Sequence, residues 1–188
     1  MNRPLPDSCL ITGSFDDRDD FSARLARALD DGPKLVQLKC KGLDQTATIA
    51  LAERAAAICA DHNVPLLIAT DPETFSRCRG DGLHLSSGAL KGVTSRPIDD
   101  DRLLSISCHT AEEMAQAAAL GADILFLSPI KATAAHPELE GIGWGRFSEI
   151  TKAITQPVYG LGGMQPEDLA DAKAAGAQGI ASTRPFWG

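Results

Sequence analysis

Short apolar segments alternate with helix-like segments along the whole chain, and this alternation limits the possible folds more than any other feature. Most of the apolar segments are continuous runs, which is typical of strands in a parallel sheet covered on both faces. Parallel strands joined by helices form α/β folds with right-handed crossovers. Eight strands are expected, at residues 9–13, 34–40, 64–70, 82–85, 102–109, 123–130, 157–163 and 178–183. Eight such units predict a single (β/α)8 TIM barrel rather than a doubly wound sheet, with one domain over residues 1–188.

The segments between the strands differ in length, and 188 residues is short for a barrel, for which about 250 residues are typical. Residues 44–62 form a clear Ala-rich helix, whereas the helices after the third and fourth strands must be reduced for eight units to fit a chain of this length. We therefore expect a compact barrel. An internal repeat supports it: TAEEMAQAAALGAD and QPEDLADAKAAGAQ have the same layout, and the first copy begins with a capping box from Thr110 to Glu113.

The composition excludes several kinds of partner. The net charge of −7 and the pI near 5 argue against nucleic acid and anionic membranes. No apolar run reaches the ~18 residues of a membrane span, and the first residues lack a secretory signal. Five cysteines, an odd number without a CxxC pair, predict buried reduced thiols. We therefore expect a cytoplasmic protein with a small-molecule ligand; whether it forms a homo-oligomer is left open.

Chemistry in such barrels takes place at the carboxyl-terminal ends of the strands. The residues expected at these ends are polar, cationic or glycine, and almost none is a carboxylate, although the whole chain is acidic. This asymmetry indicates an anionic ligand. The candidate site residues are Gln37, Lys39, Lys41, His109, Thr133, His136, Gly162, Gly163, Ser182 and Thr183.

Gly162 and Gly163 are the most informative of these residues. A glycine pair after the seventh strand exposes backbone N–H groups and lets a ligand approach the chain closely. In many barrels the loops after strands 7 and 8 bind phosphate. Ser182 and Thr183, at the end of the eighth strand, are therefore expected at the same phosphate site. The alternative is that the glycines only form a tight turn.

Gln37, Lys39 and Lys41 are spaced two residues apart, so their side chains share one face if the second strand continues to Lys41. We interpret the two lysines as a second anion site across the barrel mouth. The alternative is that they extend from the strand end into solvent.

The histidines allow several roles. His109 ends the fifth strand and can act as a general acid or base, or can be a hydrogen-bonded structural residue. His84 lies inside the shortest strand and fits a structural role better, while His136 fits a solvent-exposed residue or a lid contact. No spacing matches HxH or HExxH, so no metal site is predicted from them.

Taken in order, the motifs resemble one known superfamily. VQLKCK, GLHL, SISCHT, LSPI, GIGW, YGLGGM and QGIAS follow the order of thiamine phosphate synthases and TenI proteins over nearly the whole chain. The chain is especially similar to the synthase-like domain that some bacteria carry fused behind a Nudix hydrolase. The resemblance implies a (β/α)8 barrel. It also implies an activity: synthases join a pyrimidine pyrophosphate to a thiazole phosphate with Mg²⁺ on two acidic residues, whereas TenI proteins shift a thiazole double bond with a histidine and no metal.

Several site residues of the superfamily have counterparts in this sequence. The motif Q-[FL]-R-x-K corresponds to residues 37–41, with Lys39 in place of the arginine, which keeps the charge but loses the bidentate fork. The resemblance also assigns roles to the strand-five histidine and to the strand-six threonine. The residues carried over in this way are Gly162, Gly163 and Ser182 at the thiazole phosphate, together with His109 and Thr133.

Other positions differ from the superfamily. Asn-Asp after the third strand is Ala69-Thr70, with Asp71 one position later, and GQED after the fourth strand is SSGA. His136 replaces the lysine that meets pyrophosphate. The resemblance therefore implies a protein that binds a thiazole phosphate or a similar phosphorylated heterocycle, with His109 moving a proton and without a cofactor. The alternatives are a thiamine phosphate synthase that uses Mg²⁺ through Asp71, and a non-catalytic phospholigand-binding or regulatory module.

Overall fold

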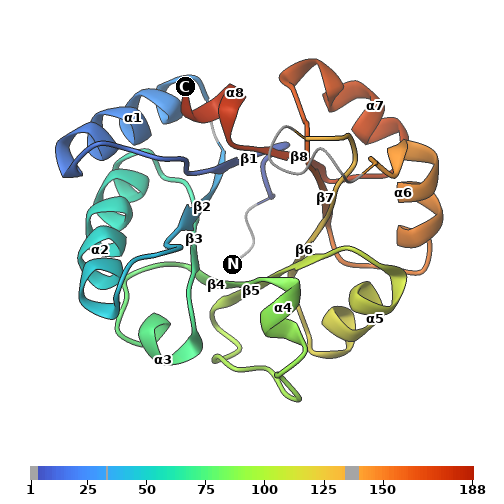
Figure 1. Ribbon diagram of the computed structural model, residues 1–188, viewed down its shortest axis with the longest axis horizontal. Helices are drawn as coiled ribbons and strands as arrows, with labels where there is room; N and C mark the ends of the chain where they lie inside the picture. The colour runs from blue at the N-terminus through green and yellow to red at the C-terminus, as the bar shows by residue number, and fades with distance from the viewer. Residues whose placement is uncertain (1–3, 33, 134–139) are drawn as a thin grey trace.

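The structure is a computed structural model that describes residues 4–32, 34–133 and 140–188. Eight parallel strands pair in chain order and close into a barrel, with the helices around its outside (Figure 1). The predicted (β/α)8 barrel is therefore confirmed. The strands are β1 (Ser8–Ile11), β2 (Leu35–Lys39), β3 (Leu66–Ala69), β4 (Gly82–Leu85), β5 (Leu103–Cys108), β6 (Ile124–Leu127), β7 (Val158–Leu161) and β8 (Gly179–Ser182).

The helices differ in length as the sequence predicts. They are α1 (Arg18–Asp30), α2 (Gln45–Asp61), α3 (Pro72–Phe75), α4 (Ser87–Leu90), α5 (Ala111–Ala119), α6 (Gly143–Thr151), the 3₁₀ turn η1 (Pro166–Asp168), α7 (Leu169–Ala174) and α8 (Arg184–Trp187). The helices after the third and fourth strands, α3 and α4, have only four residues each. None of the helices in the described ranges is long and apolar enough to cross a membrane.

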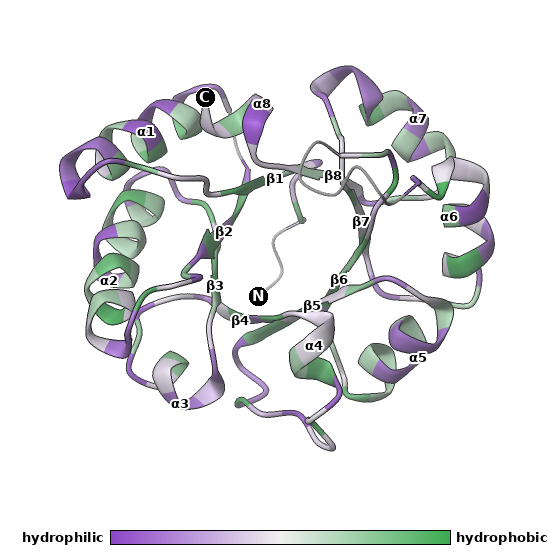
Figure 2. Cartoon of the chain, in the orientation of Figure 1, coloured by the Kyte–Doolittle hydropathy of each residue, from purple (hydrophilic) through white to green (hydrophobic). Residues whose placement is uncertain are grey.

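The apolar side chains form two shells separated by the sheet. The inner shell fills the barrel and contains Cys9, Ile11, Leu35, Leu67, Ile124, Phe126, Tyr159 and Ala181. The outer shell lies between the sheet and the helices, whose exposed faces are hydrophilic (Figure 2). All five cysteines are buried and free, which confirms the predicted reduced thiols.

The internal repeat ends each copy with the same backbone contact at the amino-terminal end of the barrel. The Asp123 N–H donates to the Leu104 carbonyl of β5 at 2.8 Å, and the Gln178 N–H donates to the Val158 carbonyl of β7 at 2.8 Å.

Two aspartates outside this shared pattern extend the contact with a carboxylate. Asp81, which precedes β4, donates its N–H to the Leu66 carbonyl of β3 at 2.8 Å and accepts the Leu66 N–H on Oδ2 at 2.8 Å. Asp123 Oδ2 accepts the Leu104 N–H at 2.7 Å in the same way. These carboxylates satisfy N–H groups at the starts of β3 and β5.

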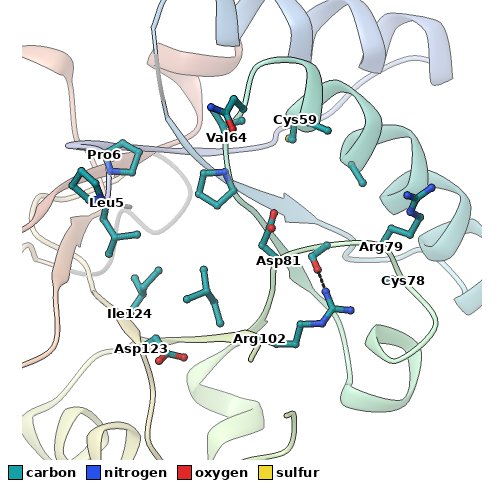
Figure 3. A pocket seen from close by; sticks show the side chains of 17 residues that line it. Leu5, Pro6, Cys59, Val64, Cys78, Arg79, Asp81, Arg102, Asp123 and Ile124 are labelled. Atoms are coloured by element: carbon teal, nitrogen blue, oxygen red, sulfur yellow. Dashed lines mark hydrogen bonds between the residues drawn. The ribbon is translucent and has the colours of Figure 1, made fainter. Parts of the chain in front are cut away.

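A pocket of about 970 Å³ also lies at this amino-terminal end. Figure 3 shows Asp81, Arg102 and Asp123 around it, with Leu5 of the first segment on the opposite wall. These residues precede the strands, so the pocket is at the end of the barrel opposite to the candidate site. None of the candidate site residues lines it.

Closure of the barrel depends on Gly179 at the start of β8. A Cβ atom there would overlap the carbonyl oxygen of Asp7, which accepts the Ile180 N–H at 3.0 Å. We predict that Gly179→Ala lowers the free energy of unfolding by about 1–3 kcal/mol, as overpacking does. The matched control is Gly145→Ala on exposed α6, where a Cβ meets nothing within 4 Å. That change should stabilise the protein by up to about 1 kcal/mol. Equal free energies of unfolding for the two variants, measured in urea, would contradict the overlap at β8.

Candidate functional site

One half of the barrel mouth is formed by polar side chains from β2, β4 and β5. Strand alternation and register place them on the same inner face as the apolar shell, because His84 pairs with Ala69 and Ser105, and Ser107 pairs with Phe126. We call this set the polar half of the mouth; it comprises Gln37, Lys39, His84, Ser105 and Ser107. The apolar shell therefore ends near the carboxyl-terminal edge of the sheet, where hydrogen-bonding groups replace it.

His84 joins two serines into a hydrogen-bonded chain. Its Nδ1 lies 2.9 Å from Ser105 Oγ and its Nε2 lies 3.0 Å from Ser107 Oγ. The Ser105 hydroxyl donates to the Leu83 carbonyl at 3.2 Å. Because a hydroxyl has one hydrogen, His84 Nδ1 must donate to Ser105, and the Nε2 lone pair must accept from Ser107. The Ser107 hydroxyl hydrogen is thus engaged, which leaves its oxygen free to accept a bond at the mouth.

The environment of His84 keeps the imidazole neutral. Burial lowers its pKa to about 4, and the ring packs edge-on against Phe126 with ring centroids 5.4 Å apart. A neutral ring is required for the chain described above, since a charged imidazole would donate from both nitrogens. The structure agrees with the structural role expected for His84 and adds that this role orients Ser107.

The two lysines after Gln37 are not equivalent. Lys39 is the last residue of β2, and its N–H donates to Thr12 Oγ1 at 2.9 Å. Lys41 lies beyond the strand in an exposed turn, while Cys40 is buried in the outer shell. The strand therefore does not continue to Lys41, and the expectation that alternation places Lys41 on the face of Gln37 and Lys39 is wrong.

Gln37 carries an unsatisfied acceptor. Its side chain is 7% exposed, and its Oε1 has no hydrogen-bond partner among the residues that the structure describes. Leaving such an atom unpaired costs about 1–3 kcal/mol. A ligand with an N–H or O–H donor would remove this cost, which is consistent with the predicted substrate-binding role of Gln37.

His109 is held at the end of β5 by three contacts. Its Nδ1 lies 2.9 Å from the Ser128 carbonyl oxygen and 3.2 Å from Ser128 Oγ, and its backbone N–H donates to Glu113 Oε2 at 2.7 Å. Because the shorter Nδ1 contact is to a carbonyl, which only accepts, Nδ1 carries a hydrogen, and Nε2 is the atom that can hold the lone pair of the exposed ring.

The predicted capping box next to His109 forms only in part. The Glu113 N–H donates to Thr110 Oγ1 at 3.2 Å, but the Glu113 carboxylate binds His109 instead of Thr110.

The other half of the mouth is formed by backbone after β7 and β8. Gly162 and Gly163 have φ angles of 98° and 70°, which favour glycine. A Cβ on Gly162 would lie 2.9 Å from Pro129 Cα, so the turn also packs closely on the loop after β6. Ser182 Oγ donates to the Met164 carbonyl at 2.9 Å, which fixes the same turn from β8. Thr183 begins α8 and accepts the Trp187 N–H at 2.8 Å.

The remaining two candidate residues come from the loop after β6. Thr133 lies within its described part, whereas His136 lies outside the described residues. The sequence analysis assigned no role to the neighbouring pair Lys131 and Asp168, whose Nζ and Oδ1 atoms are 2.6 Å apart. It also missed Ser105 and Ser107, although the alternation in SIS places both on the face of His109.

At the ends of β3 and β4 the carboxylate that could serve Mg²⁺ as a hard oxygen ligand is Asp71. Asp71 caps α3: its Oδ1 accepts the Thr74 N–H at 2.9 Å, and this bond lowers the pKa of its carboxyl. Ser86 caps α4 and accepts the Ala89 N–H at 3.2 Å. Within the described ranges no group of three or more His, Cys, Asp or Glu residues could hold a metal ion.

The fold and the mouth together define a (β/α)8 barrel whose carboxyl-terminal end carries polar side chains on one half and a glycine turn on the other. The sequence model of the thiamine monophosphate synthase family matches residues 8–186, and the chain belongs to this family.

Two curated relatives agree with the family. A protein of Aquifex aeolicus, provisionally named thiamine-phosphate synthase 2, is 30% identical over 182 residues, which cover 97% of this chain and 98% of the relative. A Bacillus cereus thiamine-phosphate synthase is 32% identical over 178 residues, covering 90% of this chain and 80% of that protein.

Solved structures show the same fold at lower identity. A thiamine phosphate pyrophosphorylase from Pyrococcus furiosus superposes with a TM-score of 0.75 and 18% identity, covering 94% of this chain and 85% of that one. A 3-dehydroquinate dehydratase from Geobacillus kaustophilus gives a TM-score of 0.69 and 14% identity, with coverage of 97% and 83%. At these identities the likeness establishes the barrel fold and does not identify the substrate.

The buried neutral His84 predicts a loss of stability in mild acid. Its folded pKa of about 4 lies below its ordinary value of 6.5, so between these values only the unfolded chain takes up the proton. The contribution of neutral His84 to the free energy of unfolding is complete above pH ~6.5. It falls by up to about 3 kcal/mol as the pH drops toward ~4. Urea unfolding from pH 5 to 7.5 should show this slope, and His84→Asn should flatten it.

His62 provides the opposite control. The Ile58 carbonyl and the Asp30 carboxylate raise the pKa of His62, so its contribution is present below pH ~6.5 and lost as the pH rises. His62→Gln should therefore make the acid slope steeper. A slope that is the same in His84→Asn and the unchanged protein would show that His84 is not the neutral buried group.

Proposed function

We propose that the protein is an enzyme of thiamine biosynthesis type that binds a thiazole phosphate or a similar small phosphorylated heterocycle at the carboxyl-terminal mouth of the barrel. Gly162, Gly163, Ser182 and Thr183 bind the phosphate through the backbone of their two loops. Gln37 and Lys39 face the ligand from the opposite side. Family membership and the cationic, glycine-rich mouth support this assignment.

The geometry best supports proton transfer by His109 without a metal. The observation that carries this reading is the bond from His109 Nδ1 to the Ser128 carbonyl at 2.9 Å, which leaves the Nε2 lone pair as a base. Imidazole exchanges protons near neutral pH. A shift of a double bond within the heterocycle requires removal and return of one proton, which a single oriented base can perform.

The names of the relatives favour a second function, the thiamine phosphate synthase reaction. In that reaction the thiazole nitrogen forms a bond to the pyrimidine methylene carbon, and the bond to pyrophosphate breaks. Asp71 is the carboxylate left to hold Mg²⁺ near β3 and β4, so much of the charge on the leaving group would fall to lysines. Lys39 is exposed at the end of β2, and Lys41 lies in the exposed turn beyond it.

One pair of assays separates these functions. We expect the purified protein to isomerise thiazole carboxylate phosphate at an unchanged rate in chelator, and His109→Ala to lose at least about 100-fold in rate, the usual contribution of a general base. His62→Ala, the same change at a helix end, should keep full activity. Thiamine phosphate formed from the two synthase substrates, and abolished by chelator, would instead establish the synthase. If neither reaction occurs but thiazole phosphate raises the melting temperature, the protein is a binding module.

Gln37 tests the placement of the ligand. We predict that Gln37→Leu raises the free energy of unfolding by about 1–3 kcal/mol, because it removes a buried unpaired acceptor. The same change should weaken binding of thiazole phosphate, since the ligand loses its acceptor. Gln156→Leu, in the loop before β7 at the opposite end of the barrel, should change neither quantity comparably. A destabilised Gln37→Leu variant would mean that the Oε1 atom is already satisfied in the free protein.

A further inference from the structure

The loop after β6 and the turn after β7 are joined closely along their backbones. The Ile130 N–H donates to the Leu161 carbonyl at 2.8 Å, and the Lys131 N–H donates to the Gly162 carbonyl at 3.0 Å. A Cβ on Gly163 would lie 2.8 Å from Lys131 Cβ. The side chain of Lys131 therefore starts directly against the glycine turn.

From this position Lys131 reaches across to the segment that follows the turn. Its Nζ lies 2.6 Å from Asp168 Oδ1, while Asp168 Oδ2 accepts the Gln165 N–H at 2.9 Å. The Asp168 side chain is only 11% exposed and that of Lys131 is 49% exposed. Each carboxylate oxygen thus has one partner, and in the sequence the two partners lie on either side of Gly163.

The Asp168 carboxylate stays ionised at neutral pH. Burial raises the pKa of the Asp168 carboxyl, but the hydrogen bonds from Lys131 and Gln165 outweigh this effect, so the pKa lies below its ordinary value. The ammonium of Lys131 is therefore neutralised by a persistent carboxylate. The paired Lys131 ammonium attracts a second anion only weakly. This favours a role for Lys131 in holding the turn over direct contact with the ligand.

We propose that Lys131 and Asp168 are positioning residues that hold the Gly162–Gly163 turn in its anion-binding conformation. The proposal rests on the function proposed above, because it assigns the phosphate to this turn. A backbone anion site works only when its N–H groups already point together. The pair closes a ring from Lys131 through Asp168, Gln165 and Gly163 back to the Lys131 backbone, and so removes freedom from the turn before the ligand arrives.

The first experiment needs no ligand. Hydrogen exchange of the Gly162, Gly163 and Met164 amides should become about fivefold faster in Lys131→Met, in Asp168→Asn and in the double variant. Lys131→Arg should restore the protection.

The matched control is Lys173→Met, which removes a similar pair with Asp7 at 2.5 Å, at the amino-terminal end of the barrel. Unchanged exchange in both single variants, or an equal acceleration in Lys173→Met, would overturn the proposal.

The second experiment measures binding of inorganic phosphate and thiazole phosphate by calorimetry. Both single variants should bind about fivefold more weakly, and the double variant no more weakly than either, because one interaction is lost in each case. Tighter binding by Asp168→Asn would show instead that Lys131 contacts the anion directly, and would overturn the positioning role. If the unchanged protein binds neither ligand, the proposed function fails, while the exchange result still decides whether the pair holds the turn.

Discussion

Closing eight parallel strands into a barrel forces every second side chain of each strand into one shared interior. This constraint decides what the chain can place at its mouth. The apolar shell around Phe126 and Tyr159, whose rings stack with centroids 5.4 Å apart, fills the barrel interior beneath the mouth. A polar group on the same faces must then form its hydrogen bonds within the protein or with a ligand. Ser105 and His84 bond to each other, whereas Gln37 Oε1 has no partner among the described residues.

The same constraint explains why so much of the fold could be predicted from the sequence. Alternation of apolar strands with capped helices fixes the order of elements, and parallel pairing then leaves few arrangements for eight units. The reduced helices α3 and α4 follow from the short length of the chain for a barrel of eight units. The side-chain placement in β5 also follows from period-two alternation, once the strand is known.

The parts that could not be predicted depend on contacts between segments distant in the sequence. Strand β2 stops at Lys39, and the chain turns so that Cys40 enters the outer shell, which local alternation at Lys41 does not reveal. One exception is local, because the Glu113 carboxylate binds the His109 N–H, four residues away, rather than the Thr110 N–H. The tautomers of His84 and His109 depend on carbonyls of other residues, and the Lys131–Asp168 pair joins residues 37 positions apart.

These contacts divide the mouth into two halves with different physical demands. The half after β7 and β8 is formed by backbone, so it needs glycine at positive φ and close packing but few particular side chains. The half from β2 to β5 is formed by side chains, and its chemistry changes whenever one of them is replaced. Ala69 and Thr70 at the end of β3 therefore change the charge on the side-chain half without touching the glycine turn, for which we propose a phosphate. A chain of the family's barrel can in this way keep one half of its mouth while residues on the other half change.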